Sequence, residues 1–256
     1  CGLYKDFTTY FNTYYNAKTI FERTEEEILK QKKDPFQFRE EVQGGRSLFP
    51  SNQTQQFSNE LRNSNQFSNQ QFGSQSSSQF ASGNLFSGNI NQDLTKVIEK
   101  CSKILQYEKE SSFFPDALFM TGKALYYQQE YSKAQRKFIE LAGLNTNKYN
   151  LINKLWLAKT YLQLRDFDEG LKLIEEVKKE AIEKEEDKIF NEASITKISF
   201  LLFREQYIQA ISECQIFIDN STDDEMKALV ANQMGLIYLI SINIIALYLW
   251  LLIIFY

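Results

Sequence analysis

The sequence predicts an all-α fold in which antiparallel helix pairs stack in series as a solenoid, interrupted by a disordered Asn/Gln/Ser/Phe-rich insertion. The first observation is a pattern of apolar and small residues that fits a helix, a turn and a second helix, and that recurs within residues 93–233. The second is an abrupt change to Asn, Gln, Ser and Gly over residues 44–92. One helix pair cannot bury its own apolar face, so we expect the pairs to stack on one another.

Residues 1–43 are predicted to contain one amphipathic helix, over residues 7–33. Its apolar side chains follow the three- and four-residue steps of a helix. They are Phe11, Tyr14, Ala17, Phe21, Thr24 and Ile28. The acidic turn "TEEE" that begins at Thr24 is interpreted as part of the solvent-facing side.

Residues 44–92 are predicted to be disordered. Single phenylalanines interrupt the polar sequence, as in "QQFSNE", "NQFSNQ", "QQFGSQ" and "SQFASG". Such a composition cannot bury enough apolar surface to offset the entropy lost when the chain is ordered. The spaced aromatic residues could serve as weak contacts for self-association or for a partner. The alternative is a tolerated insertion with no binding role.

The helix pairs of residues 93–233 are predicted from three related segments. "EYSKAQRKF", "DFDEGLKLI" and "QYIQAISEC" are interpreted as second helices, preceded by first helices in "DALFMTGKALYY", "INKLWLAKTYLQ" and "ASITKISFLLF". Small residues pair across the first two units, Gly122 with Ala134 and Ala158 with Gly170. They would let the helix axes approach at the short end of the ~8 to 10 Å range. Aromatic side chains such as Trp156 are expected to fill the core.

These segments resemble the tetratricopeptide repeat. The matching residues are Leu118, Gly122, Leu125, Tyr131, Ala134, Phe138 and Leu141 in one unit, and Leu157, Ala158, Tyr161, Phe167, Gly170, Ile174 and Val177 in the next. The third unit departs from the pattern, because Ile198 stands where a small residue is usual. By the same resemblance, "LTKVIEKCSKIL" from Leu94 is the second helix of an earlier unit, whose first helix would be the N-terminal helix.

The resemblance implies a noncatalytic interaction scaffold that binds a protein or peptide on the concave face lined by the first helices. The partner-binding positions that it implies are Asp116, Phe119, Lys123, Tyr126, Tyr127, Ile152, Leu155, Lys159 and Gln163. Lys123 and Lys159 could form a clamp for an acidic or C-terminal carboxylate group, with tyrosines as aromatic contacts. The alternative is that these positions hold ordinary solvated lysines and half-buried tyrosines.

The residue content argues against catalysis, cofactors and nucleic acid. The chain contains no histidine, which removes imidazole metal ligands and the usual general base near neutral pH. Basic residues are mixed with acidic ones and the net charge is −4, so we expect no basic stripe for a phosphate backbone. The charged run after Glu175 is spaced as ion-paired exposed faces, with Lys178 and Lys179 on an outer surface, rather than as a metal site. Without a Gly-rich phosphate loop, no cofactor or small-molecule substrate is expected.

The cysteines bear on the location of the protein. Cys1, followed by Gly, resembles the mature N-terminus of a bacterial lipoprotein, which implies a lipidated Cys1 and membrane anchoring. The expected role is then a lipid-anchored component of envelope assembly or secretion, in the outer membrane facing the periplasm. The alternative is a soluble cytoplasmic adaptor or chaperone-like module. Cys101 and Cys214 lie on apolar helix faces and are expected to be buried.

Residues 234–256 form an uncharged, apolar C-terminal segment. It is long enough to cross the ~30 Å hydrocarbon core of a bilayer. Three interpretations remain open: a membrane segment, a last repeat, or an altered end such as a shifted reading frame. Ala246 lies one repeat length after Ala210, which favours the last two.

Overall fold

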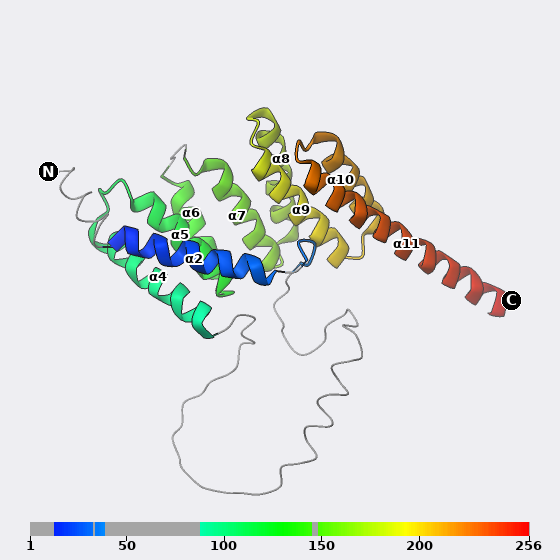
Figure 1. The fold of residues 1–256 in the computed structure, drawn as a ribbon, viewed down its shortest axis with the longest axis horizontal. Helices are drawn as coiled ribbons and strands as arrows, with labels where there is room; N and C mark the ends of the chain where they lie inside the picture. Colours follow the sequence, from blue (N-terminus) through cyan, green and yellow to red (C-terminus); the bar gives the residue numbers. More distant parts are fainter. Residues whose placement is uncertain (1–12, 33, 39–87, 145–147, 256) are drawn as a thin grey trace, which may run out of the picture.

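A computed structural model describes residues 13–32, 34–38, 88–144 and 148–255 of the chain. Over these residues it contains nine α-helices and no β-strand (Figure 1). The helices are α2 (Tyr15–Gln31), α4 (Gly88–Tyr107), α5 (Phe114–Tyr127), α6 (Tyr131–Ala142), α7 (Asn150–Gln163), α8 (Phe167–Glu183), α9 (Asp187–Phe203), α10 (Tyr207–Asn220) and α11 (Asp224–Phe255). The prediction of an all-α fold is confirmed.

Each helix packs against the next one along the chain, from α2 against α4 to α10 against α11. Figure 1 shows this order as a row that leads from α2 and α4 at one end to α11 at the other. Contacts also join alternate helices, since α5 lies against both α2 and α7, and α7 lies against α9. The helices are thus packed sequentially in adjacent pairs, which is consistent with a helical repeat. We call α2, α5, α7 and α9 the first helices, and the surface that they share the first-helix face.

Helix α4 begins at Gly88, four residues before the predicted end of the insertion at residue 92. Ile90 explains the difference, because it lies one helical turn before Leu94 on the same apolar stripe and is only 1% exposed. These first residues of α4 are therefore helical, not disordered. Residues 39–87, which hold the rest of the predicted insertion, lie outside the described residues, as do Cys1 and Phe11.

Glycines permit close packing inside two of the helix pairs. A Cβ atom added at Gly122 would lie 2.5 Å from Cε1 of Phe138, a contact that no real Cβ makes. At Gly170 an added Cβ would lie 2.7 Å from Cδ2 of Leu162 and 3.2 Å from the carbonyl oxygen of Ala158. At both positions the facing helix occupies the space of a side chain, as the spacing of small residues predicted.

Four tight turns between consecutive helices share one geometry. In the last of them the N–H of Gln206 donates to the carbonyl of Leu201 at 2.9 Å, and the N–H of Glu205 donates to that of Leu202 at 3.0 Å. This is the Schellman pattern, which places the residue after the helix in the left-handed region. The residues with positive φ are Gln129 (65°), Arg165 (64°), Glu185 (56°) and Glu205 (56°). None is glycine, so each turn carries a conformational cost of ~1 to 2 kcal/mol.

The chain segment that follows α2 reaches the other end of the first-helix face. Phe36 is 5% exposed and belongs to the apolar core that α7 to α11 build. Two residues later, the Phe38 ring packs against Phe200 and Phe203 of α9, with ring centroids 5.5 and 5.2 Å apart. The segment 34–38 therefore links the first helix pair, α2 and α4, to helix α9 of the fourth pair.

Lys178 does not lie on an outer surface, and that prediction was wrong. Its side chain is on the buried stripe of α8, between Ile174 and Ala181, and the residue is 4% exposed. Its ammonium group pairs with the carboxylate of Glu213 in α10. The neighbouring Lys179 does face solvent, since 81% of its side chain is exposed.

The C-terminal segment continues α11 to Phe255 as one helix, without the turn that a helix pair requires. Over the residues that the structure describes, no helix is both long enough and apolar enough to cross a membrane.

The expectation for the two internal cysteines is confirmed. Cys101 and Cys214 are both fully buried free thiols. Burial raises the pKa of each to about 12. Neither is therefore a reactive thiolate near neutral pH.

Candidate functional site

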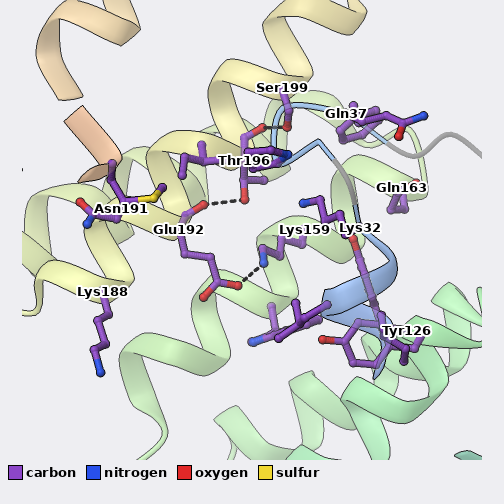
Figure 2. Close-up of a pocket in the computed structure, with 18 of the residues that line it drawn as sticks. Lys32, Gln37, Tyr126, Lys159, Gln163, Lys188, Asn191, Glu192, Thr196 and Ser199 are labelled. Atoms are coloured by element: carbon purple, nitrogen blue, oxygen red, sulfur yellow. Dashed lines mark hydrogen bonds and ion pairs between the residues drawn. The ribbon is translucent and has the colours of Figure 1, made fainter. Parts of the chain in front are cut away.

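A cavity of about 550 Å³ lies on the first-helix face, and we call it the first-helix pocket (Figure 2). Its walls come from α2, α5, α7, α9, the starts of α6 and α11, and the segment 34–38. The lining residues are Ile28, Leu29, Lys32, Pro35, Gln37, Phe38, Tyr126, Tyr127, Gln129, Tyr131, Trp156, Lys159, Gln163, Lys188, Asn191, Glu192, Ile195, Thr196, Ser199, Asp223 and Met226. Apolar atoms make up most of the surface that lines the cavity, which is typical of a site that takes an apolar ligand group.

Trp156 lies at the centre of a charged and aromatic network across the first helices. The ammonium of Lys159 lies 4.5 Å from the centroid of its ring, and that of Lys123 lies 4.7 Å away. Each lysine also has a carboxylate partner, Glu192 of α9 for Lys159 and Glu25 of α2 for Lys123, the latter at 2.5 Å. The network thus joins α2, α5, α7 and α9, and its cations are already neutralised within the chain.

Glu192 and Tyr127, which both belong to this network, differ in their ionisation at neutral pH. Burial raises the pKa of Glu192, but the facing Lys159 outweighs it, so the pKa is lowered on balance. The Tyr127 hydroxyl donates to Oε1 of Glu25 at 2.6 Å. Burial, together with this carboxylate, raises the pKa of Tyr127 well above its ordinary value. At neutral pH the pocket therefore holds an ionised Glu192 and a neutral Tyr127.

Two side-chain amides in the pocket wall leave hydrogen-bonding capacity unused. Oε1 of Gln163 and Oδ1 of Asn191 are buried acceptors that have no hydrogen-bond partner in the described part of the chain. The neighbouring hydroxyls differ, because Thr196 donates to the carbonyl of Glu192 at 2.7 Å and Ser199 to that of Thr196 at 2.9 Å (Figure 2). Buried acceptors without partners are uncommon, so a ligand that carries N–H or O–H donors would satisfy them.

The structure brings together four of the nine predicted partner-binding residues. Tyr126, Tyr127, Lys159 and Gln163 all line the first-helix pocket. Lys123 lies beside it, with a side chain that is 14% exposed. Both lysines are therefore paired and largely covered, and the expected open clamp for a carboxylate is not what their geometry provides.

The other predicted positions are used in packing between units. Leu155 is completely buried in the core, so it cannot contact a partner. Asp116 is 7% exposed and accepts hydrogen bonds from Lys148, at 2.5 Å, and from the hydroxyl of Tyr149. These positions were expected to face outward, but α7 covers one side of α5, and α9 covers one side of α7.

Phe119 and Ile152 are half-buried. The Phe119 ring packs against Tyr149, with centroids 4.8 Å apart. Ile152 packs against the cores on both sides of α7. Neither residue lines the first-helix pocket.

Sequence reasoning missed the contribution of α9, although a signal was present. Asp116, Phe119 and Lys123 lie at offsets of −6, −3 and +1 from Gly122. The same offsets from Ile198 give the three residues Glu192, Ile195 and Ser199, and all of them line the pocket. The contribution of the segment 34–38 to the pocket has no such signal in the sequence, because this segment is not helical and no repeat pattern covers it.

The described residues offer no group of three or more Cys, Asp or Glu side chains that could hold a metal ion. The chain has no match among models of protein families, curated proteins or solved structures. The likeness that the chain shows is therefore limited to its series of sequentially packed helices.

Proposed function

We propose that the protein is a tetratricopeptide-like solenoid that serves as a noncatalytic interaction scaffold and holds a segment of a partner protein in the first-helix pocket. The observation that carries the proposal is the pocket itself, which consecutive first helices build together. Helix pairs in series place equivalent positions side by side, and this is how repeat proteins form extended binding surfaces. Lys159 of α7 and Ser199 of α9 stand at the same offset in their units, one residue after Ala158 and Ile198, and both line the pocket, which supports this origin of the site.

The chemistry of the wall favours an uncharged partner segment. Lys159 and Glu192 neutralise each other, and the unused acceptors are the amide oxygens of Gln163 and Asn191. An extended peptide presents backbone N–H groups to such acceptors and places apolar side chains against Trp156 and the neighbouring rings. The acidic ligand that the two lysines first suggested is disfavoured, since it would have to displace carboxylates already in place.

A substitution that narrows the pocket tests the proposal. Thr196 is half-buried in the wall, and among the described residues its hydroxyl bonds only to the Glu192 carbonyl of its own helix, so Thr196→Arg adds bulk and charge without removing a tertiary hydrogen bond. Thr19→Arg is the matched control, because Thr19 is exposed on α2 and makes the same bond, to the carbonyl of Tyr15 at 2.9 Å.

The partner would be isolated from the source cells with wild-type protein, identified by mass spectrometry and then titrated against both variants. We expect Thr196→Arg to weaken binding at least tenfold and Thr19→Arg to leave it unchanged, with both variants retaining the wild-type helical signal. Equal affinities for the three proteins would place the partner on another surface. A scaffold of this kind would serve equally in an envelope or in a cytoplasmic adaptor, so the test does not depend on location.

A further inference from the structure

The ring of Phe38 fills an aromatic site on α9 and the start of α8, which we call the phenylalanine site. Its walls are Phe200 and Phe203, and Phe167 supports Phe200 at a centroid distance of 5.1 Å. The guanidinium of Arg204 lies 5.3 Å from the centroid of the Phe167 ring. The site is open enough that Phe38 remains half-buried.

Side-chain packing holds the occupant of this site. The hydrogen bonds of residues 34–38 to described residues stay within the segment: the N–H of Phe36 donates to Oδ1 of Asp34 at 2.8 Å, and that of Gln37 to the Asp34 carbonyl at 3.4 Å. Gln37 itself is exposed. The site therefore requires a phenylalanine ring preceded by a residue that tolerates solvent.

The same two-residue unit recurs in the sequence that follows. Of the six phenylalanines in residues 44–87, four come directly after Gln, as Phe38 does: Phe57, Phe67, Phe72 and Phe80. Every Gln-Phe dipeptide of the chain lies within residues 37–80, and the residues beside the four rings are neutral Ser, Asn, Gln, Gly and Ala. We propose that the phenylalanine site is a docking site for these Gln-Phe segments of the same chain, which exchange with Phe38 as its occupants.

Tethering favours the protein's own segments over those of a second copy. Phe57 follows Phe38 by 19 residues, and the buried Phe36 anchors the chain next to the site. Covalent linkage to a nearby site gives a segment an effective concentration on the order of millimolar, above the micromolar concentration of a typical protein sample. Because the entropy of loop closure rises slowly with length, the more distant phenylalanines lose little against the nearest one.

A double-mutant cycle tests whether the segments share the site. Phe38→Ala is combined with the fourfold change F57A/F67A/F72A/F80A in the full chain, and Tm is measured for the four proteins. If the distant rings replace Phe38, we expect Phe38→Ala alone to lower Tm by ~1 to 2 °C, and by ~4 to 6 °C in the fourfold background. Phe38→Leu is measured in parallel as a milder change, in case the alanine variant does not fold in the fourfold background.

Two further measurements separate the explanations. Phe114→Ala, at a half-buried ring on α5, is the control, and its effect on Tm should be the same in both backgrounds. If Phe38→Ala also lowers Tm by the same amount in both backgrounds, the segments do not enter the site and the inference is overturned. If the coupling grows with protein concentration, the occupant comes from a second copy, which contradicts docking within one chain. Since the cycle reads stability alone, its failure would leave the proposed partner binding untouched.

Discussion

Lys178 of α8 and Glu213 of α10 form an ion pair that is almost completely withdrawn from solvent, with side chains 5% and 2% exposed. Lys197 of α9 approaches the same carboxylate, with its ammonium nitrogen 2.6 Å from Oε2. Burial lowers the pKa of Lys197, but Glu175 and Glu213 outweigh it and raise the pKa on balance. One buried carboxylate thus joins three consecutive helices.

Removing one member of this cluster should destabilise the protein, because it leaves a buried charge without one of its oppositely charged partners. We expect Lys178→Met to lower the free energy of unfolding by about 2 to 4 kcal/mol, less than for an isolated pair because Lys197 remains. Lys179→Met removes the same charge from an exposed side chain and should change it by less than about 0.5 kcal/mol. Urea titrations of the three proteins provide the measurement, and similar midpoints for both variants would contradict the buried position of Lys178.

The close contact at Gly122 predicts a position-specific effect of a single methyl group. Gly122→Ala places Cβ against the Phe138 ring and should destabilise the protein by about 1 to 3 kcal/mol through overpacking. Gly235→Ala is the matched control, since no atom lies within 4 Å of its added Cβ, and in the middle of α11 it should stabilise by up to about 1 kcal/mol. Opposite signs in thermal unfolding are expected; a gain in stability at both positions would mean that helix packing around Gly122 is looser than described.

The left-handed turn residues predict a route to higher stability. Glu205 has a φ of 56°, which a glycine adopts without steric cost, so Glu205→Gly should stabilise the protein by about 0.5 to 1 kcal/mol. Arg204→Gly, one residue earlier, is the comparison, because its φ of −85° gives glycine no advantage, so the entropic loss and the lost contact with the Phe167 ring should both destabilise the protein. Denaturation midpoints should move in opposite directions, whereas a loss at Glu205 would argue against the Schellman turn.

The helices could be predicted from the sequence because their apolar residues repeat at helical spacing. Gly122 and Gly170 were found in this way, since a small residue at a fixed place in each unit has a packing cause. For Lys178 the prediction was wrong. A charged side chain is usually exposed, but Lys178 lies on the buried stripe of Ile174 and Ala181.

The pocket could be predicted only in part. Repeat offsets located Lys159 and Gln163, but they give one face of an isolated helix pair and say nothing of what the next pair covers. That is why Leu155 was expected at the surface and lies in the core. The crossing of Phe36 and Phe38 is a contact between distant parts of the chain, set by tertiary packing that no local pattern encodes.

The lowered pKa of Glu192 predicts how the pocket responds to acid. A carboxyl whose folded pKa lies below the ordinary value of 4.5 stabilises the protein at higher pH, and this contribution is lost as the pH falls below 4.5 and through the folded pKa. Glu192→Gln should therefore be less stable than wild type at pH 7, and the difference should shrink as the solution approaches about pH 3.5.

Glu99→Gln, at an exposed position of α4, serves as the control and should differ little from wild type at either pH. Urea midpoints measured across this range decide the matter: a difference that persists at low pH would show that Glu192 contributes by packing rather than through its ion pair with Lys159.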